Sequence, residues 1–247
     1  MIQLANLKAA YMNRRSFCRA PIVLSLTYGV GFHGLAQSLT LSDITNAQAS
    51  SGLKMALEKG ALSAVNILGQ VNGFMGNENV RIPLPGYLED AAKLMRTFGQ
   101  GAKLDELVTA MNQAAEKAVP LARDMLIGAV KSINVQDAKK ILMGSDTAVT
   151  QFFAEKTRHP LHLKFLPIVT QTTARANLSE KYNQIAARAA GLGLIKSDQF
   201  TIQNYVTEKA LDGLYFMISE EEKKIRQDPV GTGSAILNKV FGALKNS

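Results

Sequence analysis

Tryptophan is absent from this 247-residue sequence, cysteine occurs once, and aromatic residues make up only 6% of the chain. The single cysteine, Cys18, cannot form an intramolecular disulfide, and it lies in an N-terminal segment that we expect to be removed. The mature protein is therefore predicted to lack a disulfide, a thiol nucleophile and a thiolate metal site. No stretch alternates apolar and polar residues for long enough to predict a β-strand, so a sheet-based fold is not expected.

Helix-forming residues dominate what is present. Alanine and leucine supply much of the 47% hydrophobic content, and both favour helix. Apolar residues recur at helical spacing from Ser50 to Leu68, from Leu104 to Ser132 and from Thr201 to Gln227. Because no repeat and no flexible linker divides the chain, the sequence predicts an all-α fold, a single-domain multi-helix bundle over residues 41–247.

Proline marks the expected interruptions of this pattern. Pro120 should kink or split the 104–132 helix, because proline lacks a backbone N–H and clashes with the preceding turn. Pro160 is expected to interrupt a second helix in the same way. The stretch 69–86 keeps neither a helical nor a strand period, and its two prolines favour extended backbone. It is predicted to form one long irregular loop.

The formal net charge of +8 does not mark a nucleic-acid-binding surface. Four of the basic residues fall within the first 36 residues, which contain no acidic residue. The remaining charges are mixed in sign along each predicted helix, a pattern typical of solvated helix faces. Without a basic stripe or an aromatic platform, nucleic acid is not an expected partner.

Residues 12–38 have the three-part organisation of a secretory signal peptide: a basic cluster, an apolar run and small residues around Ala36. The apolar run from Pro21 to Ala36 contains three glycines and is shorter than the roughly 20 apolar residues of a membrane span. We therefore expect no stable transmembrane anchor. Cleavage near Ala36 is predicted to remove residues 1–36 as an export signal.

The basic cluster indicates which export route is used. Arg14, Arg15 and Phe17 resemble the motif of the bacterial twin-arginine export signal. This resemblance implies export of a protein that has already folded. Asn13 and Arg19 depart from the residues that are usual at their positions, so an ordinary general-secretion signal stays the alternative. Either route leads out of the cytoplasm, and the sequence predicts a periplasmic protein.

The expected loop contains one basic residue, Arg81, and two apolar residues, Phe74 and Met75, which are predicted to fill a gap between helices. On a helical wheel of the 201–227 segment, Glu221 falls at about 100°, in the middle of the apolar face. An unpaired buried carboxylate is costly, so Arg81 is expected to pair with Glu221. This pair is either architectural, or the floor of a pocket in which Arg81 binds a ligand carboxylate or phosphate.

Two other polar groups lie in helical segments. Glu208, Asp212 and Tyr215 share the opposite side of the last long helix. Glu208 and Asp212 form either a solvated face or paired carboxylates for acid–base work or cation binding. Asn112 and Glu116 lie one helical turn apart, and they either satisfy each other or cap a neighbouring backbone.

His159 and His162 are the only histidines beyond the expected export signal, and Glu155 precedes His159 by one turn. Their spacing does not fit the metalloprotease pattern, and Pro160 is expected to break the helix that would align them. No metal site and no cofactor is therefore predicted. No nucleophile elbow, Ser/His/Asp arrangement or dinucleotide fingerprint is recognisable, so no catalytic residue is assigned.

Three stretches together resemble one known family: GFMGNENVRIPLP at 73–85, MNQAAEKAVPLA at 111–122 and YVTEKALDGLYFMISEEEKKIRQDP at 205–229. They are similar to the bacterial domain-of-unknown-function family numbered 4197, and the resemblance runs from about residue 41 to the C-terminus. It implies an exported, helical protein. It implies no activity that could be carried over to this chain.

The residues favour a non-enzymatic periplasmic protein that binds an envelope protein or a small ligand. The nine methionines, several at core spacing, would let a groove adapt its shape. One alternative is a hydrolase-like enzyme that uses Glu208, Asp212 or Glu221 of the last long helix. Another is a carrier that holds an apolar molecule between helices in a dry cavity.

Overall fold

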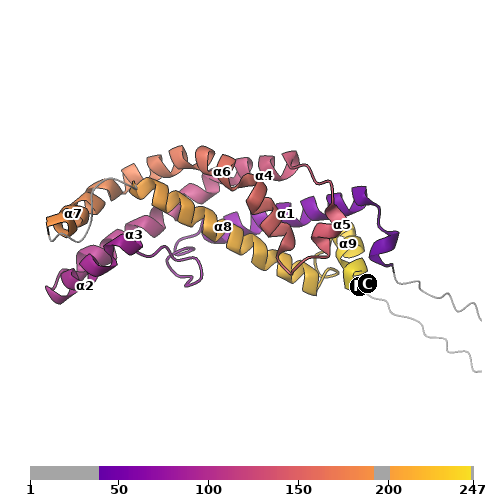
Figure 1. The fold of residues 1–247 in the computed structure, drawn as a ribbon, viewed down its shortest axis with the longest axis horizontal. Helices are drawn as coiled ribbons and strands as arrows, with labels where there is room; N and C mark the ends of the chain where they lie inside the picture. Colours follow the sequence, from indigo (N-terminus) through magenta and orange to yellow (C-terminus); the bar gives the residue numbers. More distant parts are fainter. Residues whose placement is uncertain (1–38, 192–200, 246–247) are drawn as a thin grey trace, which may run out of the picture. The chain divides into compact units, whose positions relative to one another are not determined.

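The computed structural model describes residues 39–191 and 201–245, and in these residues helices alternate with connections and no β-strand occurs (Figure 1). The all-α prediction is confirmed. The expected export signal, with Arg14, Arg15 and Phe17, lies outside the described residues. Within the described ranges, no helix is long and apolar enough to cross a membrane.

The helices follow one another along the chain with the following bounds: α1 (Asn46–Leu68), α2 (Glu89–Thr97), α3 (Gly101–Ala118), α4 (Arg123–Ser132), α5 (Ala138–Leu142), α6 (Ala148–Arg175), α7 (Leu178–Gly191), α8 (Ile202–Gln227) and α9 (Ala235–Lys245). Short 3-10 turns lie before α1, α2 and α4: η1 (Leu41–Asp43), η2 (Gly86–Leu88) and η3 (Val119–Ala122). Residues 69–85 connect α1 to η2 as one irregular segment, hereafter the 69–85 loop.

Helix α1 lies against α8 and also contacts α4, α5 and α9 (Figure 1). Small residues one turn apart allow this close packing, and all four are buried: Gly52, Ala56, Gly60 and Ala64. A Cβ atom added at Gly60 would lie 3.0 Å from Cγ2 of Ile218 in α8. Large side chains fill the rest of the core, among them the fully buried Phe153, Phe165 and Phe241.

Side-chain caps begin two of the helices. The Thr45 hydroxyl accepts a hydrogen bond from the Gln48 N–H (3.2 Å), and the Gln48 side chain accepts one from the Thr45 N–H (3.1 Å). This capping box begins α1 four residues before the expected start at Ser50. Thr201 caps α8 by accepting from the Asn204 N–H (3.3 Å), and α8 has the predicted bounds.

The two central prolines have different effects. Pro120 lies in η3, which separates α3 from α4 as predicted. Pro160 lies inside α6, which continues through it to Arg175, so the predicted interruption there is wrong. A proline inside a helix costs about 3 kcal/mol or more. In α6, burial of residues on both sides of it, such as Phe153 and Phe165, offsets that cost.

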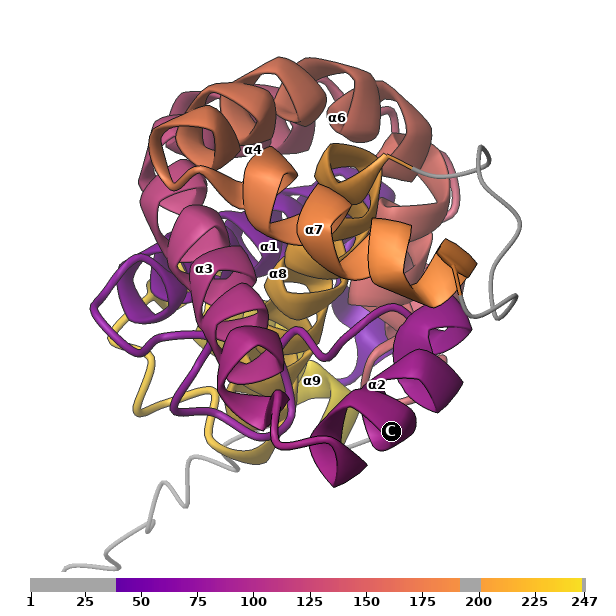
Figure 2. The same cartoon turned by 90° about the vertical axis from the view of Figure 1, so that its left-hand side faces the viewer.

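The 69–85 loop, purple in Figure 2, runs past α3 and α8 near the end of the structure where α2 and α7 lie. Hydrogen bonds from α3 and α8 reach its backbone, so the loop is fixed between two helices that are far apart in the sequence. The fold thereby brings the three family-like stretches, 73–85, 111–122 and 205–229, into contact.

Candidate functional site

Asn112 of α3 fixes the second half of the 69–85 loop. Its side chain is fully buried. The Oδ1 atom accepts from the Ile82 N–H (2.9 Å), and Nδ2 donates to the carbonyls of Ile82 (2.9 Å) and Val108 (2.8 Å). One side-chain amide thus gives Ile82 the pair of bonds that a neighbouring β-strand would give. Residues 81–85 of the loop thus belong to neither a helix nor a sheet.

Glu116, one turn further along α3, fixes the first half. Its Oε1 atom accepts from the N–H groups of Phe74 (3.1 Å) and Met75 (3.1 Å). Glu116 is only 6% exposed, and hydrogen bonds to a carboxylate are stronger than those between neutral groups. Of the two roles expected for Asn112 and Glu116, the structure has the second, because both bind a neighbouring backbone.

Helix α8 contacts the opposite side of the loop. The Phe74 ring is fully buried, and Met75 is partly buried against the same core. The Tyr205 hydroxyl donates to the Pro83 carbonyl (3.0 Å), and the Asn77 side-chain amide lies 3.9 Å from the sulfur of Met217. The loop is therefore held on two sides.

The contact between Phe74 and Gly213 leads to a direct prediction. A Cβ atom at position 213 would lie 2.7 Å from Cε1 of Phe74. Gly213→Ala is expected to lower the free energy of unfolding by about 1–2 kcal/mol, because overpacking outweighs the gain in helix propensity. Gly128→Ala in α4, where a Cβ atom meets nothing within 4 Å, should raise it by about 0.5–1 kcal/mol. Urea unfolding of both variants measures the difference, and equal effects would contradict close packing at Gly213.

Tyr205 makes the loop contact sensitive to alkaline pH. Burial, followed by the negative charges of Glu89 and Asp212, raises the pKa of Tyr205 to about 12. The folded pKa exceeds the unfolded value of about 10, so the stabilisation by the neutral phenol is complete below pH 10 and is lost as pH rises through 12. Burial also raises the pKa of Tyr87 and that of Tyr215, so we expect ultraviolet titration to show late tyrosinate ionisation whose amplitude falls by that of one tyrosine in Tyr205→Phe. A wild-type protein whose tyrosines all ionise near pH 10 would contradict this assignment.

The predicted ion pair between Arg81 and Glu221 is not formed. Arg81 is exposed to solvent, and Glu221 pairs with Lys224 of its own helix (3.6 Å). Because the loop is held through its backbone, it does not require a buried cation. Arg81 is therefore neither a structural ion-pair partner of Glu221 nor part of a pocket floor with it.

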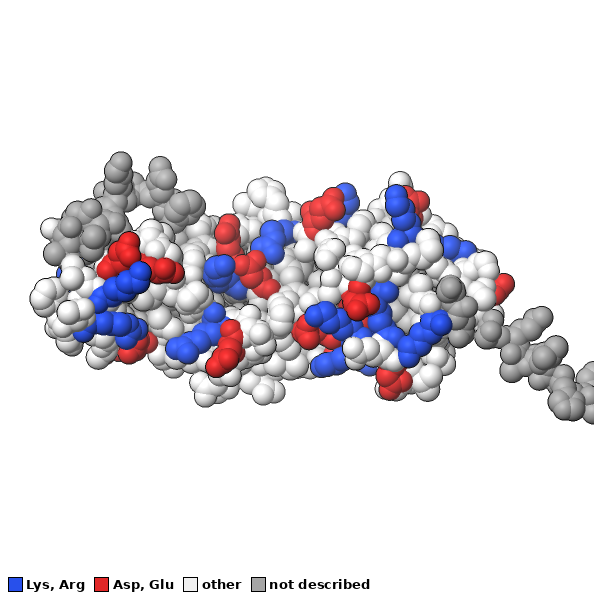
Figure 3. All heavy atoms as spheres, turned by 60° about the horizontal axis from the view of Figure 1, so that its bottom comes forward, with Lys and Arg blue, Asp and Glu red and all other residues white. Residues whose placement is uncertain are grey.

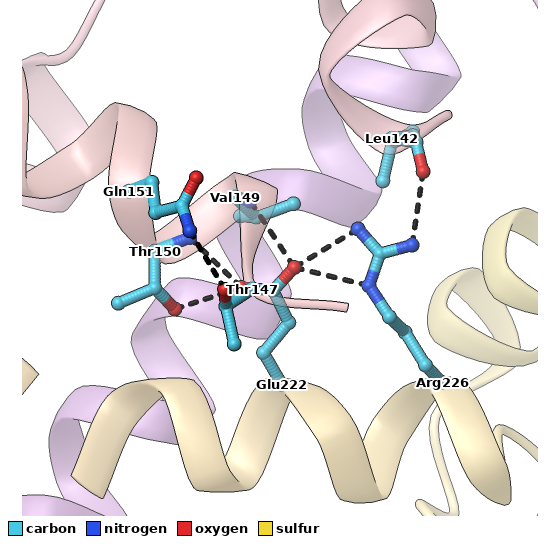
Figure 4. A network of polar contacts seen from close by, with 7 residues as sticks. All are labelled: Leu142, Thr147, Val149, Thr150, Gln151, Glu222 and Arg226. Carbon is cyan, nitrogen blue, oxygen red and sulfur yellow. Dashed lines mark hydrogen bonds and ion pairs between the residues drawn. The ribbon is translucent and has the colours of Figure 1, made fainter. Parts of the chain in front are cut away.

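The carboxylate that α8 directs into the core belongs to Glu222, next to the predicted residue (Figure 4). It accepts from the N–H groups of Val149 (3.1 Å) and Thr150 (2.8 Å) and from the Thr150 hydroxyl (2.7 Å). These residues form the first turn of α6, where a negative charge is favourable. Arg226 binds the same carboxylate (2.9 Å) and donates to the Leu142 carbonyl at the end of α5 (2.9 Å).

The geometry of α8 explains this shift by one residue. Its buried positions follow an i, i+4 series along the helix: Ile202, Val206, Ala210, Leu214, Ile218 and Glu222. Four residues cover about 400° at 100° each, so each step of this series turns by about 40° around the helix. An apolar face drawn at a fixed angle from Ile202 therefore misses the C-terminal end of the series. Following the series, instead of one fixed face, would have identified Glu222.

Glu208, Asp212 and Tyr215, predicted to share one side of α8, have different environments in the structure. Glu208 is exposed, whereas Asp212 pairs with Arg158 of α6 (2.7 Å) and with Lys209 (3.3 Å). Tyr215 is buried, its hydroxyl lies 2.9 Å from that of Thr157, and the Arg158 guanidinium stacks over its ring. Tyr215, which was expected on the side opposite the apolar face, thus lies in the core.

The histidines lie on the continuous helix α6, where His159 is exposed and His162 is partly buried. Glu155 pairs with Lys156 (3.3 Å). In the part of the chain that the structure describes, no group of three His, Cys, Asp or Glu side chains is placed to hold a metal ion. On the face shown in Figure 3, cationic and anionic side chains are interspersed, without a large area of one sign.

One of three comparisons with known proteins gives a match. No curated protein and no solved structure matches the chain. A family model described as "Protein of unknown function (DUF4197)" matches residues 43–242. This range includes the 69–85 loop, Asn112 and Glu116 of α3, and all of α8. Because the match covers most of its length, the chain belongs to this family of proteins of unknown function.

Proposed function

We propose that this protein is a non-enzymatic, exported protein of the periplasm that binds another protein of the envelope through its 69–85 loop. The observation that carries the proposal is that two buried polar side chains, Asn112 and Glu116, hold the backbone of an irregular loop. Burying polar groups has a cost that the bonds to the loop must offset. A connection between α1 and α2 would not need two buried polar side chains unless the loop had to keep one particular shape.

The loop presents side chains to solvent while its backbone is fixed. Val71 is 88% exposed, and Asn79 and Arg81 are exposed as well. Variable loops on a rigid scaffold commonly carry recognition. A loop that is already ordered loses less conformational freedom when a partner binds, which favours affinity. These residues offer an apolar contact, an amide and a cation on one preorganised segment.

The ionisable groups near the loop favour binding over catalysis by carboxylates. Glu116 is occupied by two backbone N–H groups, Asp212 by two cations and Glu221 by Lys224. The hydrolase-like alternative requires Glu208, which is exposed, or one of the paired carboxylates Asp212 and Glu221 to act on a substrate. It predicts an activity whose pH profile disappears in Asp212→Asn.

The carrier alternative is not favoured by the hollow between α3 and α7. That hollow has a volume of about 580 Å³, is open to solvent, and is lined by charged residues such as Asp105, Glu106, Lys117 and Lys181. An apolar cargo held between helices would need a dry, enclosed cavity, and this open hollow is not one.

Export to the periplasm rests on the N-terminal sequence pattern and is tested by fractionating expressing bacteria and sequencing the mature N-terminus.

A photo-crosslinking residue placed at Val71 tests the recognition proposal. The matched control position is Val230, which is 70% exposed after the end of α8. In periplasmic extract we expect a discrete adduct from position 71 and none of that mass from position 230. Excess unlabelled wild-type protein should suppress the adduct, and folded Asn112→Ala protein should compete poorly because its loop is released.

Two results would count against the proposal. The same adducts from both positions would indicate non-specific contact. An adduct that Asn112→Ala suppresses as well as wild type would show that the shape of the loop is irrelevant. A native mass spectrum of the purified protein tests whether the partner is a small ligand instead of a protein, because a retained ligand adds mass that is lost on denaturation.

A further inference from the structure

The 69–85 loop contains a pair of residues with a chemistry of its own. Asn72 precedes Gly73 in the exposed part of the loop. Glycine has no side chain to shield its backbone nitrogen, so this nitrogen can attack the side-chain amide of the preceding asparagine. We propose that Asn72 is a site of spontaneous deamidation, and that the contacts which hold the loop set its rate.

The reaction requires only water. The backbone nitrogen of Gly73 forms a bond to Cγ of Asn72, the bond from Cγ to Nδ2 breaks, and ammonia leaves with the proton of the Gly73 amide. The product is a five-membered succinimide ring. Water then opens the ring at either of its two carbonyls, which leaves aspartate or isoaspartate at position 72.

Both residues of this labile pair have a structural reason to be there. Asn72 has a φ angle of 63°, in the left-handed region that asparagine tolerates better than most residues. A Cβ atom at position 73 would lie 2.5 Å from the Ile67 carbonyl oxygen, so only glycine fits the close return of the chain to α1. The turn after α1 therefore selects a reactive sequence for conformational reasons.

The same turn holds the reacting atoms in place. The Gly73 N–H donates to the Gln70 carbonyl (3.0 Å), and the Asn72 carbonyl accepts from the Gly76 N–H (2.9 Å). Ring closure requires the Gly73 nitrogen to leave its hydrogen bond and the Asn72 backbone to rotate. Because Glu116 binds the next two N–H groups along the chain, this rotation requires local opening of the loop.

Deamidation changes the loop in two ways. Aspartate adds a negative charge at position 72. Isoaspartate adds a carbon atom to the backbone two residues before Phe74, which shifts the N–H groups that Glu116 binds. Modification would therefore weaken the hold on the loop and accelerate further opening. This consequence does not depend on what the loop binds.

Peptide mapping by mass spectrometry tests the inference on the whole chain. Folded protein and protein in urea are incubated in mildly alkaline buffer, and the conversion of Asn72 is followed over time. Asn79 is the internal control, because it is exposed in the same loop but is followed by Val80, whose branched side chain shields the nitrogen. We expect Asn72 to convert at least about tenfold faster in urea than in the folded protein, and Asn79 to convert slowly in both.

Two variants examine the part played by Glu116. Glu116→Ala, kept at a temperature at which circular dichroism shows a folded protein, should accelerate conversion of Asn72. Lys117→Ala, at the exposed neighbouring position, should not. Failure of Asn72 to convert in urea would eliminate the site. Equal rates in folded and unfolded wild-type protein would show that the loop contacts do not protect it.

Discussion

Replacing Asn112 by alanine will lower the free energy of unfolding by about 2–4 kcal/mol, which corresponds to a fall in Tm on the order of 10 °C. The variant leaves the N–H and carbonyl of Ile82 without their buried partner. Each unsatisfied buried group costs about 1–3 kcal/mol, and the better helix propensity of alanine returns well under 1 kcal/mol. Denaturant titration followed by circular dichroism measures the loss.

Gln113→Ala is the matched control, because Gln113 is the next residue of α3 and is exposed. Its effect should stay within about 0.5 kcal/mol of wild type. The same small effect for Asn112→Ala would mean that the buried amide does not hold the loop. In that case, the hydrogen bonds to Ile82 would be replaced by water at little cost.

Replacing Glu222 by alanine will have a larger effect, about 3–5 kcal/mol, because it breaks a buried ion pair by removing one partner. Arg226 then keeps a charge in a largely covered position, and the N–H groups of Val149 and Thr150 lose their acceptor. The first turn of α6 should loosen. Thermal unfolding, followed by helix signal, gives the magnitude.

Glu220 provides the comparison on the same helix. It pairs with Lys223 (2.6 Å) in a half-exposed position, so Glu220→Ala should cost less than about 1 kcal/mol. Removing Arg226 together with Glu222 should cost less than the sum of the two single losses, because the uncompensated charge is gone. Strict additivity of the two substitutions would contradict a coupled buried pair.

Helical periodicity was sufficient to predict most of the fold. The bounds of α8 and the division at Pro120 follow from spacing, caps and proline chemistry, which are local properties of the chain. Pro160 shows where local rules fail. Its cost within α6 is offset by packing against helices elsewhere in the sequence, and a linear pattern does not contain those contacts.

Only part of the candidate site could be predicted, because the sequence pattern does not contain long-range contacts. Irregular sequence identified the 69–85 loop, and apolar character identified Phe74, which is fully buried. The polar residues that hold the loop were harder to assign, because the partner of Asn112 is a backbone group 30 residues away. Backbone partners leave no trace in the sequence, whereas charge complementarity wrongly favoured Arg81 and Glu221.

Amide hydrogen exchange of Ile82 in wild-type protein, and in Asn112→Ala, tests the central claim that α3 fixes the 69–85 loop. In wild type we predict that the Ile82 N–H is protected to the same degree as core amides of α3 such as that of Met111, and far more than that of exposed Val71. Asn112→Ala should remove the protection at Ile82 and leave Met111 protected. Exchange at Ile82 as fast as at Val71 in the wild-type protein would contradict the account.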